Sequence, residues 1–357
     1  MLVKLKYLSQ ILNYSSSSSS IVLKESNILI TKDGTVGRVF LLTSENLEFL
    51  KSRYSSYLVL KPSSSCPPSY LYYYLLSPHF SSWYSEIKKS FATINHLNIS
   101  DLKEFPIIFS SLPIQQQKLI DFLNKKYHLI QELLPKIDLL LKKLEEYQEA
   151  FISEQVFKYS SICNSIKLKY IFRVCNGATP STSNPIFWNG TYLFITPTDL
   201  TMDQMYLSTS SKKLTSAVFQ NPSSRLMPPY SLVISCRGSI GKLNILPVEY
   251  FFSQSCEGLI LLNPIDHNLK YYYYYLKIHQ EYFQKIGFGS TFLAITGDTL
   301  KNFICCHLSK TQQDEIVSSL DSKMTLLTKL QSHYQSLKVH FEEYQQSLLY
   351  ETFQNPL

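Results

Sequence analysis

The residues best suited to chemistry lie in two glycine turns that are flanked by cations. One turn follows an apolar run and reads Arg237-Gly238-Ser239-Ile240-Gly241-Lys242. The other has Lys32, Gly34, Gly37 and Arg38 in the same arrangement. Glycine permits a tight backbone turn, and cations beside exposed backbone suit contact with phosphate. The same glycines also suit an ordinary hairpin. The pattern therefore predicts a phosphate contact or a hairpin, and the sequence leaves both readings open.

Catalytic and metal-binding patterns are missing from the sequence. It contains no glycine-rich loop followed by Lys-Ser or Lys-Thr, and no His-Glu-x-x-His. Asn184-Pro185-Ile186-Phe187 and Met227-Pro228-Pro229-Tyr230 each match half of an adenine-gripping Asn-Pro-Pro-aromatic site, but turn prolines explain both. The seven cysteines have neither zinc nor disulfide spacing, so Cys305 and Cys306 are interpreted as buried strand residues. We predict a non-catalytic binding protein without a metal or cofactor of its own.

The elements that position the turns come from an internal repeat. The glycine turn at 32–39 recurs 204 residues later, and the tyrosine run at 70–75 recurs 201 residues later. The phrase Leu102-Lys103-Glu104-Phe105 recurs 198 residues later. Gln115-Gln116 and Glu145-Glu146-Tyr147-Gln148 both recur 197 later. The repeat predicts four parts, which are a globular piece at 1–110, a helix at 111–157, a second globular piece at 158–308 and a second helix at 309–353.

Apolar residues in the two predicted helices alternate at spacings of three and four. The first seam runs from Leu119 to Phe151 and the second from Ile316 to Leu348, with Lys126 and Lys323 in matching gaps. Two seams of equal length on one chain predict an antiparallel helix pair. Pro135 lies inside the first seam and is expected to kink that helix without ending it.

The globular pieces predict a mixed α+β fold, with a pseudo-twofold internal repeat of two mixed α/β domains. Short apolar runs at 27–31, 231–235 and 258–262 lie between turn residues and are typical of strands. The tyrosine-rich stretches suit a strand or a helix. The apolar spacing after residue 75 favours a helix with its aromatic face in the core.

The positive charge belongs to the globular pieces. The net charge is +7 over 357 residues, and residues 1–111 hold 11 cations against 7 anions while residues 158–308 hold 13 against 7. Residues 112–157 and 309–357 are slightly acidic. We therefore expect the globular pieces to hold a polyanion, and the helices to act as a spacer and a protein-contact surface. No apolar run is long enough for a membrane helix or a signal peptide, so a soluble, cytoplasmic protein without a membrane partner is expected.

The order of several phrases resembles the specificity subunits of type I restriction-modification systems. In the second half they run from Gly177-Ala178-Thr179-Pro180-Ser181 through the Trp188 and Asp199 phrases to the turn with Gly238 and Gly241, and then to Thr291-Phe292 and the Gln312-Gln313 helix. The resemblance covers nearly the whole chain.

This resemblance implies that each globular piece is a target-recognition domain for one half of a bipartite site in double-stranded DNA. It implies a spacer role for the helices, and docking of methyltransferase subunits and a restriction subunit, which would bring S-adenosylmethionine, ATP and Mg²⁺ to the complex. Specificity subunits themselves are non-catalytic. The candidate DNA-binding residues are the cations of both turns, a lysine pair and one serine: Lys32, Arg38, Lys212, Lys213, Arg237, Ser239 and Lys242.

The first domain departs from the family pattern. Applying the repeat offset to Gly177 places its counterpart before residue 1, so we expect the first recognition domain to be incomplete at its N-terminus and poorly stable alone. A mis-set start, a truncation and a split protein all remain open. One alternative to DNA recognition is a scaffold that binds methyltransferase subunits through its helices without full DNA recognition. A stand-alone methyltransferase is a further alternative, which would have to bind S-adenosylmethionine.

Overall fold

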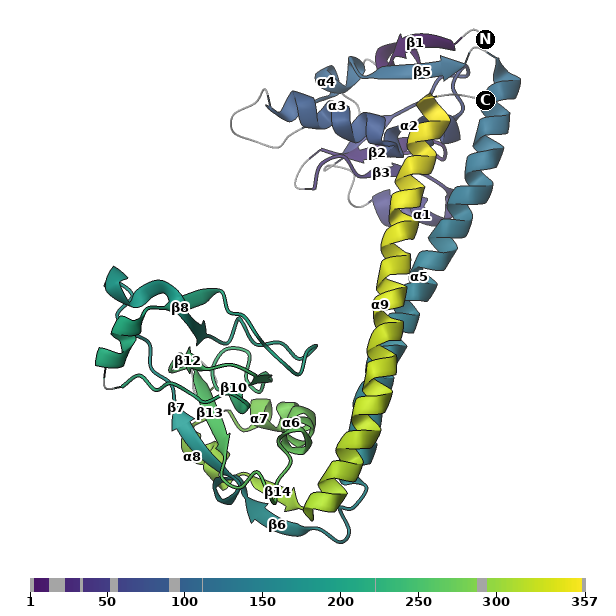
Figure 1. Ribbon diagram of the computed structural model, residues 1–357. Helices are drawn as coiled ribbons and strands as arrows, with labels where there is room; N and C mark the ends of the chain where they lie inside the picture. Colours follow the sequence, from purple (N-terminus) through teal and green to yellow (C-terminus); the bar gives the residue numbers. More distant parts are fainter. Residues whose placement is uncertain are drawn as a thin grey trace. The chain divides into compact units, whose positions relative to one another are not determined.

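A computed structural model describes residues 3–12, 23–32, 35–51, 57–89, 97–110, 112–221, 223–287 and 294–354. The chain forms two compact units (Figure 1). The first unit consists of Met1–Leu141 with Ser332–Leu357, and the second unit is Lys142–Gln331. Each unit therefore contains one globular piece and parts of both long helices. The expected fold class, two α/β domains with two long helices, is confirmed.

The second unit contains three sheets. The main antiparallel sheet has the order β11-β10-β13-β7, with strands β7 (Phe172–Asn176), β10 (Ser231–Ser235), β11 (Leu243–Leu246) and β13 (Cys256–Leu261). A smaller sheet has the order β12-β8-β9, with β8 (Trp188–Ile195), β9 (Lys212–Leu214) and β12 (Tyr250–Phe252). The third sheet pairs β6 (Asn164–Lys167) with β14 (Ile304–His307). An apolar cluster that includes Leu193, Val233 and Phe252 packs the smaller sheet against the main one.

Short helices complete the second unit. They are α6 (Leu269–Ile278), α7 (Gln280–Lys285) and α8 (Gly297–Asn302), with 3₁₀ turns η3 (Leu168–Tyr170), η4 (Pro185–Phe187) and η5 (Ser216–Gln220). Helix α6 carries five consecutive tyrosines that are all buried. Two of their hydroxyls bind the same strand residue, because Tyr271 donates to the Cys306 carbonyl at 3.3 Å and Tyr275 accepts from the Cys306 N–H at 3.1 Å. The helical reading of this tyrosine run is confirmed.

The first unit repeats this design with fewer strands among its described residues. It contains a three-stranded sheet of order β3-β2-β4 and a pair β1-β5, formed by β1 (Val3–Tyr7), β2 (Ile28–Thr31), β3 (Val39–Leu41), β4 (Tyr57–Leu60) and β5 (Pro106–Ser110). Its short helices are α1 (Ser44–Lys51), α2 (Pro68–Leu76), α3 (Pro78–Lys89), α4 (Ile99–Lys103) and the 3₁₀ turn η1 (Leu8–Gln10). On α2, Tyr70 donates to the Ile108 carbonyl at 2.7 Å and Tyr74 accepts from the Ile108 N–H at 3.1 Å. The same tyrosine pair therefore holds the strand before the long helix in both units.

The long helices α5 (Pro113–Phe157) and α9 (Lys310–Gln354) pack together as an antiparallel pair (Figure 1). In the first unit Lys338 Nζ lies 2.7 Å from Asp138 Oδ1, and in the second unit Lys158 Nζ lies 2.7 Å from Glu315 Oε1. Helix α5 continues through Pro135.

The apolar seam between these helices is covered unevenly. Ile137 and Leu327 are buried, whereas Leu140 and Leu330 remain 42% and 39% exposed, because a single partner helix covers only part of each seam. Among the described residues, no helix is long and apolar enough to cross a membrane.

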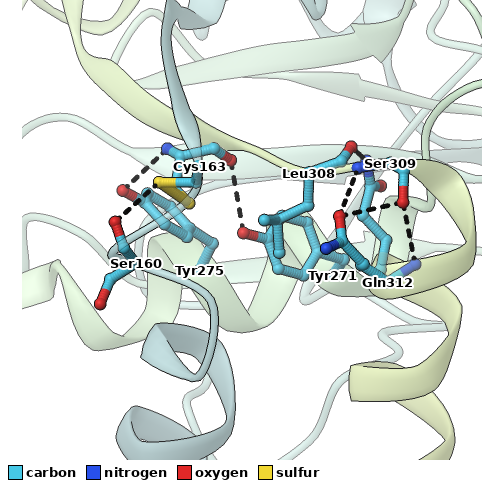
Figure 2. The surroundings of a disulfide bond; sticks show 9 residues. Ser160, Cys163, Tyr271, Tyr275, Leu308, Ser309 and Gln312 are labelled. Carbon is cyan, nitrogen blue, oxygen red and sulfur yellow. Dashed lines mark hydrogen bonds between the residues drawn. A yellow bond between two sulfur atoms is a disulfide. The ribbon is translucent and has the colours of Figure 1, made fainter.

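A disulfide joins Cys163 to Cys306 and corrects the expectation that the cysteines are unpaired (Figure 2). Cys305 and Cys306 do lie buried in a strand, as expected. The register of β14 on β6 places Cys306 opposite Ser165, two residues from Cys163, so that the two Cα atoms are 5.6 Å apart. The partners are 143 residues apart in the chain, so only the strand pairing reveals the bond.

A buried glutamine gives the first prediction. The Gln313 side chain accepts from the Asn268 N–H at 2.7 Å and donates to the Leu308 carbonyl at 2.8 Å. Replacement of Gln313 by Leu leaves both backbone groups unpaired, so we expect a loss of about 3 kcal/mol in the free energy of unfolding, measured by urea denaturation. The neighbouring Gln312 makes its bonds at the exposed start of α9, and Gln312→Leu should cost less than about 1 kcal/mol. Equal losses for the two variants would contradict this reading.

Candidate nucleic-acid interface

The turn between β10 and β11 is closed by one serine hydroxyl. Ser235 Oγ donates to the Ser239 carbonyl and accepts from the Lys242 N–H at 3.0 Å, while the Gly241 N–H donates to the Ser235 carbonyl at 2.9 Å. Gly238 and Gly241 have φ values of +73° and +85°, which favour glycine. The hairpin reading of the glycine pattern is therefore confirmed. Because turn closure uses only backbone groups and this hydroxyl, the Arg237 and Ser239 side chains remain exposed.

The first unit builds the same turn between β2 and β3. Here Thr31 takes the place of serine, because its hydroxyl donates to the Thr35 carbonyl and accepts from the Arg38 N–H at 2.9 Å. The Gly37 N–H donates to the Thr31 carbonyl at 3.0 Å, and Gly37 has a φ of +91°. Arg38 is exposed and Lys32 is half-buried. Gly34 lies outside the described residues.

A second group of candidate residues lies in the smaller sheet. Lys212 and Lys213 start β9, and both side chains are exposed. Lys212 Nζ lies 5.7 Å from the centre of the Trp188 ring, and Trp188 Nε1 donates to the Ser181 carbonyl at 3.0 Å. The structure therefore brings together Lys212, Trp188 and Ser181, which the sequence had proposed separately. This group and the β10–β11 turn lie in different sheets of the second unit.

Several of the motif residues shape loops. A Cβ added at Gly177 would lie 2.1 Å from the Ser253 carbonyl oxygen, so only glycine fits against this backbone. Asp199 accepts hydrogen bonds from the Thr196 N–H at 2.9 Å and the Ser211 N–H at 2.8 Å. Burial raises the pKa of Asp199, but hydrogen bonds from the Thr196 hydroxyl, from Ser211 and from the Thr196 N–H outweigh it and hold the pKa below its ordinary value. Pro180 is buried and Thr179 is half-buried. These positions therefore support the surface that carries the exposed cations.

One charged residue near the turn was missed by the sequence reading. Glu257 is the second residue of β13, and it is only 7% exposed. Its Oε2 has no hydrogen-bond partner among the described residues. Burial raises the pKa of Glu257 to about 7, although the charges of Lys301 and Arg237 act in the opposite direction. The only sequence signal was a single carboxylate within an apolar strand.

No group of three His, Cys, Asp or Glu side chains is placed to hold a metal ion in the described part of the chain. The exposed candidate side chains are therefore cations and hydroxyls, which suit contact with phosphate oxygens and base edges.

Comparison with known proteins identifies the architecture. The family described as the type I restriction modification DNA specificity domain matches residues 4–138 and 163–334. The chain is 30% identical over 155 residues to the type I restriction enzyme MjaIX specificity subunit of Methanocaldococcus jannaschii. The aligned stretch is 43% of this chain and 36% of that subunit, so the match spans little more than a third of the relative's length.

Two solved structures share the fold at 13% identity. A chain from a study of complex assembly and conformational transition of the type I R-M system superposes with a TM-score of 0.75, covering 99% of this chain and 98% of its own. The HsdS subunit from Thermoanaerobacter tengcongensis gives a TM-score of 0.57, with 99% and 97% covered. At this identity the likeness concerns the fold alone.

Substitution of the two glycines of the β10–β11 turn measures the cost of backbone strain apart from the cost of steric overlap. A Cβ at Gly238 meets nothing within 4 Å, whereas a Cβ at Gly241 would lie 2.8 Å from Gln280 Cγ. Gly238→Ala should therefore cost about 1 kcal/mol from its positive φ alone. Gly241→Ala should cost more, about 2 kcal/mol, because α7 must also shift. Urea denaturation of the two variants tests the difference, and equal costs would contradict the contact with Gln280.

Glu257 makes stability depend on pH. Its pKa is about 7 in the folded chain against an ordinary value of 4.5, so between these values only the folded chain holds the proton. The free energy of unfolding should therefore fall as the pH rises through this window and level off above it. Glu257→Gln should remove this part of the pH dependence in urea titrations at several pH values, whereas Glu249→Gln, at an exposed site, should leave it unchanged. A wild-type profile that Glu257→Gln does not alter would refute the assignment.

Proposed function

The chain belongs to the family of type I restriction modification DNA specificity domains, and from this premise we propose that it recognises double-stranded DNA for a restriction-modification complex. One observation carries the proposal. The same hydroxyl-closed glycine turn occurs in both units, and each copy leaves a cation exposed at the end of a hairpin. In this function the turn cations Arg38, Arg237 and Lys242 contact phosphates, and side chains of neighbouring loops contact base edges.

The distribution of charge supports DNA as the ligand. The globular pieces carry the whole positive excess, whereas the helical stretches are slightly acidic. A basic surface attracts the DNA backbone in a salt-dependent way. Lys212, Lys213 and Ser239 are exposed and are assigned here to the same DNA surface. Each unit contacts its own segment of duplex in this proposal, so the site on DNA is bipartite.

The partners are assigned to the helices. In a complex of this family the specificity subunit works with methyltransferase subunits and a restriction subunit, and these would contribute the methyl donor and the nucleotide chemistry. Apolar side chains remain exposed along α5 and α9, among them Leu129, Leu139, Leu326 and Val339, at 53%, 52%, 60% and 49%. Exposed apolar residues mark protein-contact surfaces where they gather on one surface, and these four lie on one helix pair. We assign the helices to subunit docking on this ground.

The test of DNA binding uses the full chain and fluorescent duplex DNA at several salt concentrations. Arg237→Ala with Lys242→Ala should lower the affinity at least about tenfold and reduce the slope of log affinity against log salt by about 2. Lys169→Ala with Lys285→Ala changes as many cations of the same unit, and should leave both quantities near the wild-type values. A chain that binds methyltransferase subunits but shows no affinity for any duplex would refute DNA recognition and favour the scaffold.

A further inference from the structure

The two units correspond residue by residue at their beginnings. In the first unit the Leu8 N–H donates to the Phe105 carbonyl at 2.9 Å, and in the second the Leu168 N–H donates to the Phe303 carbonyl at 2.8 Å. A bridge from Leu12 to Pro62 matches the pairing of Phe172 with Leu261. In addition, the Ser63 N–H donates to the Ile11 carbonyl as the Leu262 N–H does to the Ile171 carbonyl, both at 2.9 Å. Residues 8–12 are therefore the counterparts of residues 168–172, at an offset of 160.

The correspondence resumes with a different offset. The Ser26 N–H donates to the Leu42 carbonyl at 2.9 Å, and the Tyr230 N–H donates to the Leu246 carbonyl at 2.7 Å. Ser26 and Tyr230 also share a left-handed backbone, with φ values of 68° and 55°. The offset is now 204, so in the sequence the interval 13–25 of the first unit corresponds to the interval 173–229 of the second. A single offset had placed the shortening before residue 1, whereas these contacts place it inside the first unit.

The extra residues of the second unit form most of its smaller sheet. They contain β8, β9 and the loops that carry Trp188, Asp199, Lys212 and Lys213. The third strand of that sheet, β12, lies between β11 and β13. In the first unit the corresponding connection, between β3 and β4, contains helix α1 instead. The described residues of the first unit therefore hold no counterpart of the β12-β8-β9 sheet.

Larger side chains in the first unit take up the space of the missing sheet. A Cβ at Gly258 in β13 would lie 2.6 Å from Met227 Cε and 3.0 Å from Phe252 Cζ, so these two side chains would have to shift to admit a larger residue. Its counterpart in β4 is Val59, because Val59 pairs with Leu29 as Gly258 pairs with Val233.

The same replacement occurs at two neighbouring positions. By strand register, Asn244 and Cys256 of the second unit correspond to Phe40 and Tyr57 of the first. The Phe40 and Tyr57 rings meet edge to face at 6.0 Å, in an apolar cluster with Leu29 and with Leu47 of α1. These larger side chains of the first unit therefore lie on the sheet face that corresponds to the face covered by the smaller sheet in the second unit.

We propose that the chain reads DNA asymmetrically, with the second unit determining the base sequence and the first unit providing a phosphate contact of little sequence preference. The inference rests on the proposed function. The first unit keeps the hairpin turn, with Lys32 and Arg38, but its described residues hold no counterpart of the layer that carries Lys212 and Lys213. The recognised DNA therefore has one specified half-site beside a segment of nearly free sequence.

The test is selection of binding sites by the full chain from a library of duplex DNA with a randomised core. We expect one block of specified bases in the enriched sequences. Two blocks of comparable information would overturn the asymmetry while leaving the proposed function intact. If no sequence is enriched at all, the asymmetry and the proposed sequence-specific function both fail.

Two double variants show which unit recognises the block of specified bases. Lys212→Ala with Lys213→Ala should reduce the preference for the selected duplex over a scrambled one by about tenfold. Lys32→Ala with Arg38→Ala should weaken binding to both duplexes alike, by about threefold to tenfold, and leave the selected bases unchanged. Urea denaturation confirms that both variants fold. A change in the selected bases caused by the second pair would place sequence reading in the first unit and overturn the proposal.

Discussion

The arrangement within each unit depends on a pair of tyrosine hydroxyls that bind both backbone groups of one strand residue. In the second unit Tyr271 and Tyr275 bind Cys306, and in the first unit Tyr70 and Tyr74 bind Ile108. A buried backbone group without a partner costs about 1 to 3 kcal/mol, so the two bonds fix the tyrosine helix against this strand. Because each of these strands leads directly into α9 or α5, the same bonds fix the start of the long helix.

The exposed turns are built upon this frame. The Ile240 side chain is buried in the same apolar cluster as α6, and Gln280 and Gln284 of α7 donate to the Ile240 carbonyl at 3.5 and 3.4 Å. One side of the turn is therefore anchored in the core, and the Ser235 hydroxyl closes the other. Because the backbone of this turn is already fixed, its cations lose little further conformational freedom when they bind. This favours tight contact with a regular polyanion. The stability of the core and the geometry of the proposed DNA contact are thus linked.

The sequence predicted the features that depend on local pattern and failed where the fold brings distant residues together. The long helices, the strands near residues 231 and 258 and the tyrosine helices follow from periodicity and from turn residues, and all were found. The Cys163–Cys306 bond depends on the register of β6 with β14, and the burial of Glu257 depends on its neighbours in a folded sheet. Neither leaves a periodic signal. The motif residue Asp199 was recognised, but only the hydrogen bonds to its carboxylate show that it shapes a loop.

The units differ in the smaller sheet that packs on the main sheet of the second unit, and Gly258 lies where these two sheets meet. A Cβ at Gly258 would lie 2.6 Å from Met227 Cε and 3.0 Å from Phe252 Cζ in β12 of the smaller sheet, whereas the matching position of the first unit holds the larger Val59. The three-stranded sheet β3-β2-β4, the tyrosine pair and the turn are all present in the first unit, whose described residues hold no counterpart of the second layer. A layer that a domain can lack while keeping its core is free to vary in sequence, and that freedom is what a surface needs if it is to read different bases on a constant frame.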